Sequence, residues 1–220
     1  MRLPDSQHPE PAPGRGRSLR ARERNRLAIL TAAQNVLSSN PDASMDDIAE
    51  AANMVRRTVY GHFSTRQDLI ASVVRLGAQE LIAYVGEVDV HADDAPAEMA
   101  GLILRTWGTA SRFGPVIEVA RRGAADALFA AMEPFNTTVA ALIRHGQEQG
   151  AFQSPLDADL LAHLIEACSL TFHAAQQKGV WDGDETDVAY SQLLTLGVPA
   201  AKARATVDRA AAAHPTEALM

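Results

Sequence analysis

Apolar residues recur at intervals of three and four along most of the chain, the spacing that places them on one face of an α-helix. Such stretches cover residues 20–39, 44–52, 55–63, 66–88, 97–112, 115–124, 126–149, 157–177, 185–197 and 200–212. Pro134 lies inside one of them and predicts a bend there, because proline cannot donate to the helical ladder. No stretch alternates between apolar and polar residues as a half-buried strand does. The pattern therefore predicts an all-α fold.

The first 19 residues lack this periodicity and contain four prolines and two glycines. They predict a disordered arm rich in arginine and proline. Three short helices then fit within residues 20–75, and longer helices fill residues 76–220. The chain is thus expected to consist of the arm, a small three-helix domain and a larger helical domain.

Composition agrees with a globular chain that buries a core. Of the 220 residues, 47% are hydrophobic, and no apolar run approaches the ~18 residues that cross a bilayer. The beginning of the chain has no signal-peptide pattern, so we expect a cytoplasmic protein without a membrane partner. The single cysteine, Cys168, excludes an internal disulfide and a multi-cysteine zinc site. His163 and His173 lie about 15 Å apart on one predicted helix, so they cannot share a metal ion with Glu166, and we expect no metal.

Charge is distributed unevenly along the chain. The net charge is −7, but the first 75 residues hold 11 arginines against 8 acids, while the remainder is strongly acidic. Such asymmetry indicates one end that faces a polyanion. Six of these arginines lie between residues 15 and 26, where they either follow a DNA backbone or minor groove or remain a solvated tail.

Residues 44–63 have the spacing of a helix-turn-helix. Such a motif needs a small residue where the second helix crosses the first, a turn residue that tolerates positive φ, and an apolar residue inside the second helix. Ala49, Asn53 and Val59 meet these needs in order. Ser44 and Asp47 resemble a capping box at the start of the first helix. An ordinary short helical hairpin has the same spacing and is the alternative.

Three runs of this region resemble the TetR (tetracycline-repressor-like) family of bacterial regulators. They are Ile48-Ala49-Glu50-Ala51-Ala52, Thr58-Val59-Tyr60-Gly61-His62-Phe63 and Arg66-Gln67-Asp68-Leu69. The family motif reads roughly I-A-x-x-A-G-V-S-x-x-T-x-Y-x-H-F-x-x-K-x-x-L, and the match covers residues 22 to about 80. The resemblance implies a helix-turn-helix domain followed by an effector-binding and dimerisation domain.

Three positions depart from that motif. Asn53 replaces the turn glycine, and Arg66 replaces the lysine. Val55 replaces the serine that caps the recognition helix, which removes a cap worth about 1 kcal/mol. The recognition helix is therefore expected to begin without the side-chain cap of the family motif.

The exposed face of the predicted recognition helix supplies the candidate DNA contacts. Arg56 and Arg57 suit bidentate hydrogen bonds to guanine, and Thr58 suits a phosphate or a thymine methyl group. The remaining candidates are Ser44, Tyr60, Gly61, His62 and Arg66. Tyr60 and His62 are included because they are similar to family residues that hydrogen-bond DNA backbone phosphates. Each arginine could instead be an ordinary solvated surface charge, and His62 could instead be a side chain packed inside the domain.

The resemblance implies two further partners for the larger domain. They are a small apolar or amphipathic effector and a second copy of the chain. The candidate effector residues are Tyr84, Arg105, Trp107, Phe113, Phe129, Phe135 and His145. The candidate dimer-interface residues are Leu160, Leu164, Cys168, Phe172, Tyr190, Leu193, Leu194 and Gly197. Packing within the subunit is the alternative for both sets.

No arrangement typical of an enzyme occurs in the sequence. It has no G-x-S-x-G, P-loop or G-x-G-x-x-G motif, and no cofactor is implied. We therefore predict a homodimeric, ligand-responsive regulator, a repressor that binds a palindromic double-stranded operator. A helical binding module or a small enzyme, each with a decayed helix-turn-helix, remains the alternative.

Overall fold

The computed structural model describes residues 13–213, with side chains described from Leu19 onward. Over that range it contains nine α-helices and no strand, which confirms the all-α prediction. The helices are α1 (Pro13–Ser39), α2 (Met45–Ala51), α3 (Arg56–His62), α4 (Arg66–Val85), α5 (Ala95–Gly123), α6 (Ala125–Glu148), α7 (Ala158–Gln177), α8 (Glu185–Thr195) and α9 (Ala200–Ala213).

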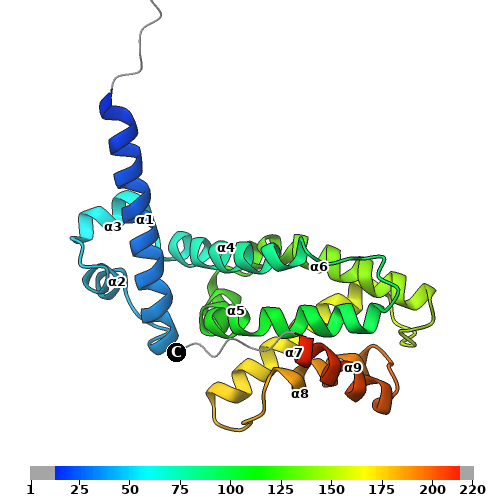
Figure 1. Ribbon diagram of the computed structural model, residues 1–220. Coiled ribbons are helices and arrows are strands. Elements are labelled where there is room, and N and C mark those ends of the chain that lie inside the picture. Colours follow the sequence, from blue (N-terminus) through cyan, green and yellow to red (C-terminus); the bar gives the residue numbers. More distant parts are fainter. Residues whose placement is uncertain (1–12, 214–220) are drawn as a thin grey trace, which may run out of the picture.

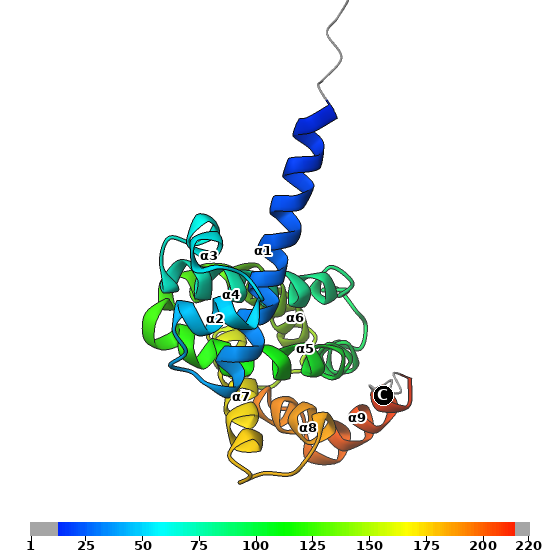
Figure 2. The ribbon, with the colours of Figure 1, turned by 90° about the vertical axis from the view of Figure 1, so that its left-hand side faces the viewer.

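Helix α1 begins earlier than the sequence pattern indicates. The sequence pattern places residues 13–19 in the arm, but they are helical, and α1 projects beyond the body of the molecule (Figures 1 and 2). Pro13 occupies the first helical position, where its fixed φ favours a helix and its missing N–H costs nothing. The rest of the predicted arm, residues 1–12, lies outside the described residues.

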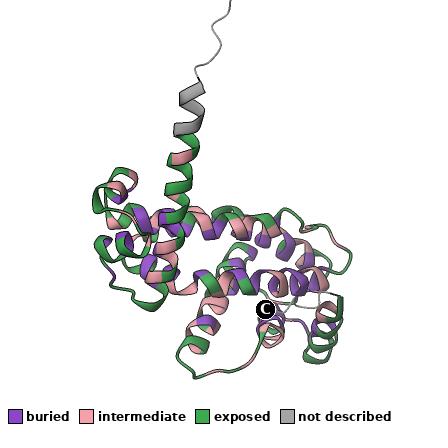
Figure 3. Ribbon diagram, turned by 60° about the vertical axis from the view of Figure 1, so that its left-hand side comes forward, coloured by how far each residue is buried: buried purple, intermediate pink, exposed green. Residues whose placement is uncertain are grey.

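Helices α1, α2 and α3 form a small head around an apolar core that continues through α4 into α5 and α6. Ile29, Leu37, Ile48 and Val59 are fully buried in it, and Phe63 is nearly so. Figure 3 shows this buried strip on the inner sides of the three helices, with exposed residues on their outer sides. The head is the predicted helix-turn-helix unit, and α4 leads from it into the rest of the molecule.

Helix α5 is the central helix of the larger domain. It packs against α4 and α6 on one side and against α7, α8 and α9 on the other (Figure 1). A second apolar core fills the space between these layers and includes Met99, Leu142, Leu161 and Leu193. In the described part of the chain no helix is long and apolar enough to cross a membrane.

The division of α5 into two helices was wrong. The sequence pattern predicted helices at 97–112 and 115–124, but α5 runs without interruption through Pro115. Proline removes one backbone hydrogen bond, yet Phe113 and Val116 on either side of it are buried. Their burial holds the helix together across the missing bond. Pro134 also lies inside a helix, α6, whose extent agrees with the single helix predicted for residues 126–149.

Candidate nucleic-acid interface and ligand cavity

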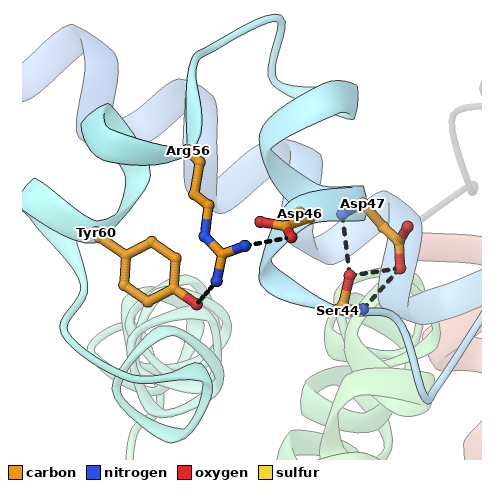
Figure 4. Close-up of polar contacts among 5 residues, drawn as sticks. All are labelled: Ser44, Asp46, Asp47, Arg56 and Tyr60. Carbon is orange, nitrogen blue, oxygen red and sulfur yellow. Dashed lines mark hydrogen bonds and ion pairs between the residues drawn. The ribbon is translucent and has the colours of Figure 1, made fainter.

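The start of α2 is fixed by a capping box. Ser44 accepts a hydrogen bond from the Asp47 backbone N–H at 3.2 Å, and its own N–H donates to the Asp47 carboxylate at 2.7 Å (Figure 4). The Ser44 backbone and hydroxyl bonds lower the pKa of the Asp47 carboxyl below its usual value. Ser44 is thereby committed to helix capping, although its position remains exposed.

The turn between α2 and α3 has the conformation that the sequence predicts. Asn53 has a φ of +52° and is the only non-glycine residue with positive φ in the described part of the chain. Val55 takes the N-cap position of α3 in an extended conformation and makes no side-chain capping bond. The recognition helix therefore begins without a side-chain cap, as the departure from the family motif indicates.

One face of α3 is buried and the other is open. Val59 is fully buried against Ile48 and Ala49 of α2, whereas Arg57, Tyr60 and neighbouring Gly61 are exposed. A side chain built at Gly61 would meet nothing within 4 Å, so the helix surface there is unobstructed. Thr58 is half-buried beside this face. The open face is about two turns long, which suits insertion into a DNA major groove.

The two arginines of α3 differ in their contacts. The Arg56 guanidinium pairs with Asp46 of α2 at 2.7 Å and donates to the Tyr60 hydroxyl at 3.5 Å (Figure 4). It also lies over the Tyr60 ring, 5.2 Å from its centroid. Arg57 makes no hydrogen bond or ion pair with any described residue. Arg57 can thus contact DNA without losing an existing bond, whereas Arg56 must first give up its ion pair with Asp46.

Two other predicted contacts have local constraints. Burial and the nearby charges of Arg22 and Arg26 lower the pKa of His62 below its usual value, so its ring is neutral at pH 7. Arg66 donates through Nε to the Ala43 carbonyl at 2.8 Å and through Nη2 to the Pro41 carbonyl at 2.6 Å. Arg66 therefore anchors the α1–α2 loop, a role that no sequence motif signals because its acceptors are backbone oxygens.

The predicted effector residues do not gather in one place. Trp107 and Phe135 line a cavity of about 30 Å³ between α5, α6, α7 and α8. Phe113 is buried nearer the head, against Gly77 of α4. Phe129 is 61% exposed on α6. The other three lie apart from the cavity: Tyr84 beside the second core, Arg105 in an ion pair with Glu98, and His145 against His91.

The cavity has polar groups that the sequence analysis missed. Besides apolar side chains, it is lined by Thr106, Glu166, Ser169 and Gln192. Gln192 is fully buried although α8 is otherwise apolar on that face. A glutamine at a core position of an amphipathic helix was the available signal, since buried polar side chains need partners or ligands.

A separate, larger hollow lies between the carboxyl-terminal halves of α5 and α7. It has a volume of about 400 Å³, and Arg121, Arg122 and Lys178 give it a basic character. His173 forms part of its wall and stacks on Trp107 with ring centroids 3.8 Å apart. Burial lowers the pKa of His173 to about 4. The Ser111 hydroxyl lies within hydrogen-bond distance of Nδ1 of His173, at 3.1 Å.

The predicted dimer residues divide into two groups. Leu160, Leu164 and Leu194 are 49%, 39% and 40% exposed, and all three lie on α7 or α8. Cys168, Phe172 and Tyr190 are half-buried on the same two helices. Leu193, by contrast, is fully buried in the second core of the chain itself. Gly197 closes the turn after α8 with a φ of +82° and packs against backbone atoms of Gln153 and Ser154.

These features are those of a helix-turn-helix head with an attached helical domain. Residues 29–73 match the family described as bacterial regulatory proteins, tetR family. The HTH-type transcriptional repressor LfrR of Mycolicibacterium smegmatis is 47% identical over 55 residues, which is 25% of this chain and 29% of that repressor. The amino-terminal part of the chain is thus similar to the TetR family of DNA-binding transcriptional regulators, and this similarity in sequence covers about a quarter of the chain.

Solved structures extend the likeness over most of the fold. RolR with resorcinol has a TM-score of 0.60 and 24% identity, covering 87% of this chain and 96% of that one. LfrR from Mycobacterium smegmatis with proflavine has a TM-score of 0.59 and 24% identity, covering 80% and 96%. FadR from Bacillus subtilis with stearoyl-CoA has a TM-score of 0.65 and 17% identity, covering 77% and 96%. The larger domain thus shares its fold with these regulators.

Proposed function

We propose that the chain is a ligand-responsive repressor that binds a palindromic operator as a homodimer. The observation that carries this proposal is the open face of α3, where Arg57 has no partner among the described residues and Tyr60 is exposed. Arginine on a recognition helix hydrogen-bonds guanine in the major groove. The neutral His62 ring and the Tyr60 hydroxyl supply donors for phosphate oxygens beside it.

The exposed leucines of α7 and α8 support the proposed homodimer. An apolar stripe formed by Leu160, Leu164 and Leu194 is costly in water and is well matched by the same stripe of a second copy. A two-fold axis between the copies presents two α3 helices to DNA. Half-sites one helical turn apart, about 34–36 Å, then form a palindrome.

Ligand response requires a link between the cavity and the head. Helix α4 leaves the head and packs against α5 and α6, two of the helices that line the cavity. A ligand that displaces α5 or α6 therefore moves α4 and changes the separation of the two heads. The bound resorcinol, proflavine and stearoyl-CoA in structures of similar regulators support a small-molecule effector here.

The decisive experiment is DNA binding by the full chain to the region upstream of its own gene, measured by gel shift and footprinting. We expect a protected palindrome whose affinity falls steeply with salt. Arg57→Ala should weaken binding by about 1–3 kcal/mol and relax specificity at one base position in each half-site. Arg122→Ala, an exposed arginine on the larger domain, is the matched control and should leave binding unchanged.

The opposite result would favour a different class of protein. If the chain ignores double-stranded DNA at low salt, the proposal is wrong and a helical binding module with a decayed helix-turn-helix replaces it. The missing side-chain cap at Val55, at the start of α3, is the observation that fits such a decayed motif. A protected site without palindromic symmetry would retain DNA binding but exclude the homodimeric arrangement.

A further inference from the structure

We infer that the effector is a compact planar molecule that carries hydroxyl or amino donors and is neutral or cationic, and not an anion. This inference rests on the proposed ligand-responsive function and identifies the chemistry of the cavity between α5, α6, α7 and α8. It is carried by the polar groups on the cavity wall. Each offers an acceptor, and no positively charged side chain lines the space.

Gln192 provides the first acceptor. Its Nε2 donates to the Ile165 carbonyl at 3.3 Å and to Ser169 Oγ at 2.7 Å. A carbonyl oxygen can only accept, so this bond fixes which end of the amide is nitrogen. The other end, Oε1, is buried and has no partner among the described residues. A fully buried amide oxygen without a donor is costly, and a ligand O–H or N–H would remove that cost.

Glu166 provides the second acceptor and the only charge on the cavity wall. Its Oε2 accepts from Asn136 Nδ2 at 2.7 Å and lies 3.8 Å from His163 Nδ1. Asn136 is itself buried, with an unpartnered Oδ1. This arrangement orients the Glu166 carboxylate without a lysine or arginine beside it. A ligand carboxylate or phosphate brought next to it would be repelled, whereas a hydroxyl or cationic amine would be bound.

Aromatic side chains determine the shape of the ligand. The Trp107 and Phe135 rings form part of the wall, and flat rings pack best against a flat partner. The cavity of about 30 Å³ holds a water-sized group, so a ring enters only if the lining side chains shift. Met99, one of those side chains, is flexible enough to do so. Enlargement on binding also supplies the movement that a regulator needs.

The basic groove between α5 and α7 is the natural place for an anion, so it makes the inference testable. Arg121, Arg122 and Lys178 line it, and Glu118 is the only acid there. An anionic effector would bind in that groove and leave Gln192 and Glu166 unaffected. The two hollows therefore predict opposite charge preferences and opposite sets of sensitive residues.

The test measures binding of four one-ring probes to the full chain by isothermal titration calorimetry: resorcinol, 1,3-dimethoxybenzene, benzamidine and benzoate. The dimethyl ether keeps the ring and both oxygens of resorcinol but replaces its two O–H donors with larger methoxy groups, and benzamidine and benzoate are planar ions of opposite charge. We expect resorcinol and benzamidine to bind at least about tenfold more tightly than the other two, the effect of one lost hydrogen bond.

Two variants assign the effect to the cavity. Gln192→Met keeps the volume but removes the amide, and should cut resorcinol affinity about tenfold. Glu166→Gln keeps the bond from Asn136 but removes the charge, and should weaken benzamidine more than resorcinol. Gln176→Met and Glu148→Gln, exposed positions on α7 and α6, are matched controls without effect. Circular dichroism melting of each variant checks that it is folded.

Gel shifts on the same samples separate this inference from the proposed function. If both donor probes fail to bind, or the ether or benzoate binds as tightly, the inference about the ligand is wrong. Benzoate binding that is lost in Arg121→Ala would assign the effector to the basic groove instead. If the chain still binds the operator in any of these cases, the regulator proposal stands. If the unliganded chain does not bind the operator, the regulator proposal is wrong, whatever the probe measurements show about the cavity.

Discussion

At the scale of single residues, two arginines of the DNA-binding head have different roles. Arg57 is exposed and unpaired among the described residues, whereas Arg66 donates to the carbonyls of Pro41 and Ala43. We predict that Arg66→Ala lowers the free energy of unfolding by about 2 kcal/mol, because both acceptors lose a charged donor. Arg57→Ala should change it by less than about 0.5 kcal/mol.

Urea unfolding of both variants followed by circular dichroism measures these differences. Arg66→Ala should also weaken binding to all DNA sequences to the same extent, because displacement of the α1–α2 loop moves Ser44 and α2. Equal stability of the two variants would show that the Arg66 bonds contribute nothing and would leave Arg66 a phosphate contact alone.

A buried histidine predicts a pH dependence of stability. The pKa of His173 is lowered to about 4 by burial, while the pKa of an unfolded histidine is near 6.5. Between these values the unfolded chain binds a proton that the folded chain does not, so stability falls as the pH drops from 6.5 to about 4. The difference corresponds to at most about 3 kcal/mol.

The variant His173→Phe should remove most of that loss while keeping a flat ring against Trp107. The measurement is the urea midpoint at about pH 7 and about pH 4.5, which lie at the two ends of the expected transition. The lowered pKa of His62 acts in the same direction and accounts for a small residual slope. If wild type and variant lose stability equally, His173 is not the group that titrates.

At the scale of single elements, α3 is the helix whose start is least well secured. Val55 occupies its N-cap position with 71% of its surface exposed and no capping bond. We predict that Val55→Ser stabilises the chain by about 1 kcal/mol, because the hydroxyl accepts a bond from a free N–H of the first turn. Little packing is lost at so exposed a position. The urea midpoint measures the gain, and Val55→Ala, which supplies no cap, is the control.

Elements whose spacing is local could be predicted from sequence. The positions of α2, Asn53 and Val59 follow from short intervals and turn chemistry, and the structure confirms them. The continuity of α5 could not be predicted, because a proline ends a helix unless burial on both sides outweighs the missing bond. The polar wall of the cavity was missed for a similar reason. Gln192 meets Ile165 and Ser169 only once α7 and α8 pack together.

At the scale of the whole molecule, the proposed two-fold assembly would determine whether two heads act together on DNA. The helices that carry the exposed leucines, α7 and α8, lie on the opposite side of the molecule from α4 (Figure 1). An isologous interface contains each residue twice, so one substitution places two changes in it. We predict that Leu164→Arg converts the dimer to a monomer, because two buried unpaired charges cost several kcal/mol.

Size-exclusion chromatography with light scattering measures the mass of the particle, and circular dichroism shows whether the monomer is folded. Operator affinity should fall at least about tenfold, since a single head makes half of the DNA contacts. Ala83→Arg, at an exposed position on α4, adds the same charge away from the stripe and should stay dimeric. A Leu164→Arg protein that remains dimeric would place the two-fold axis on another face, and the separation of the heads would then depend on different helices.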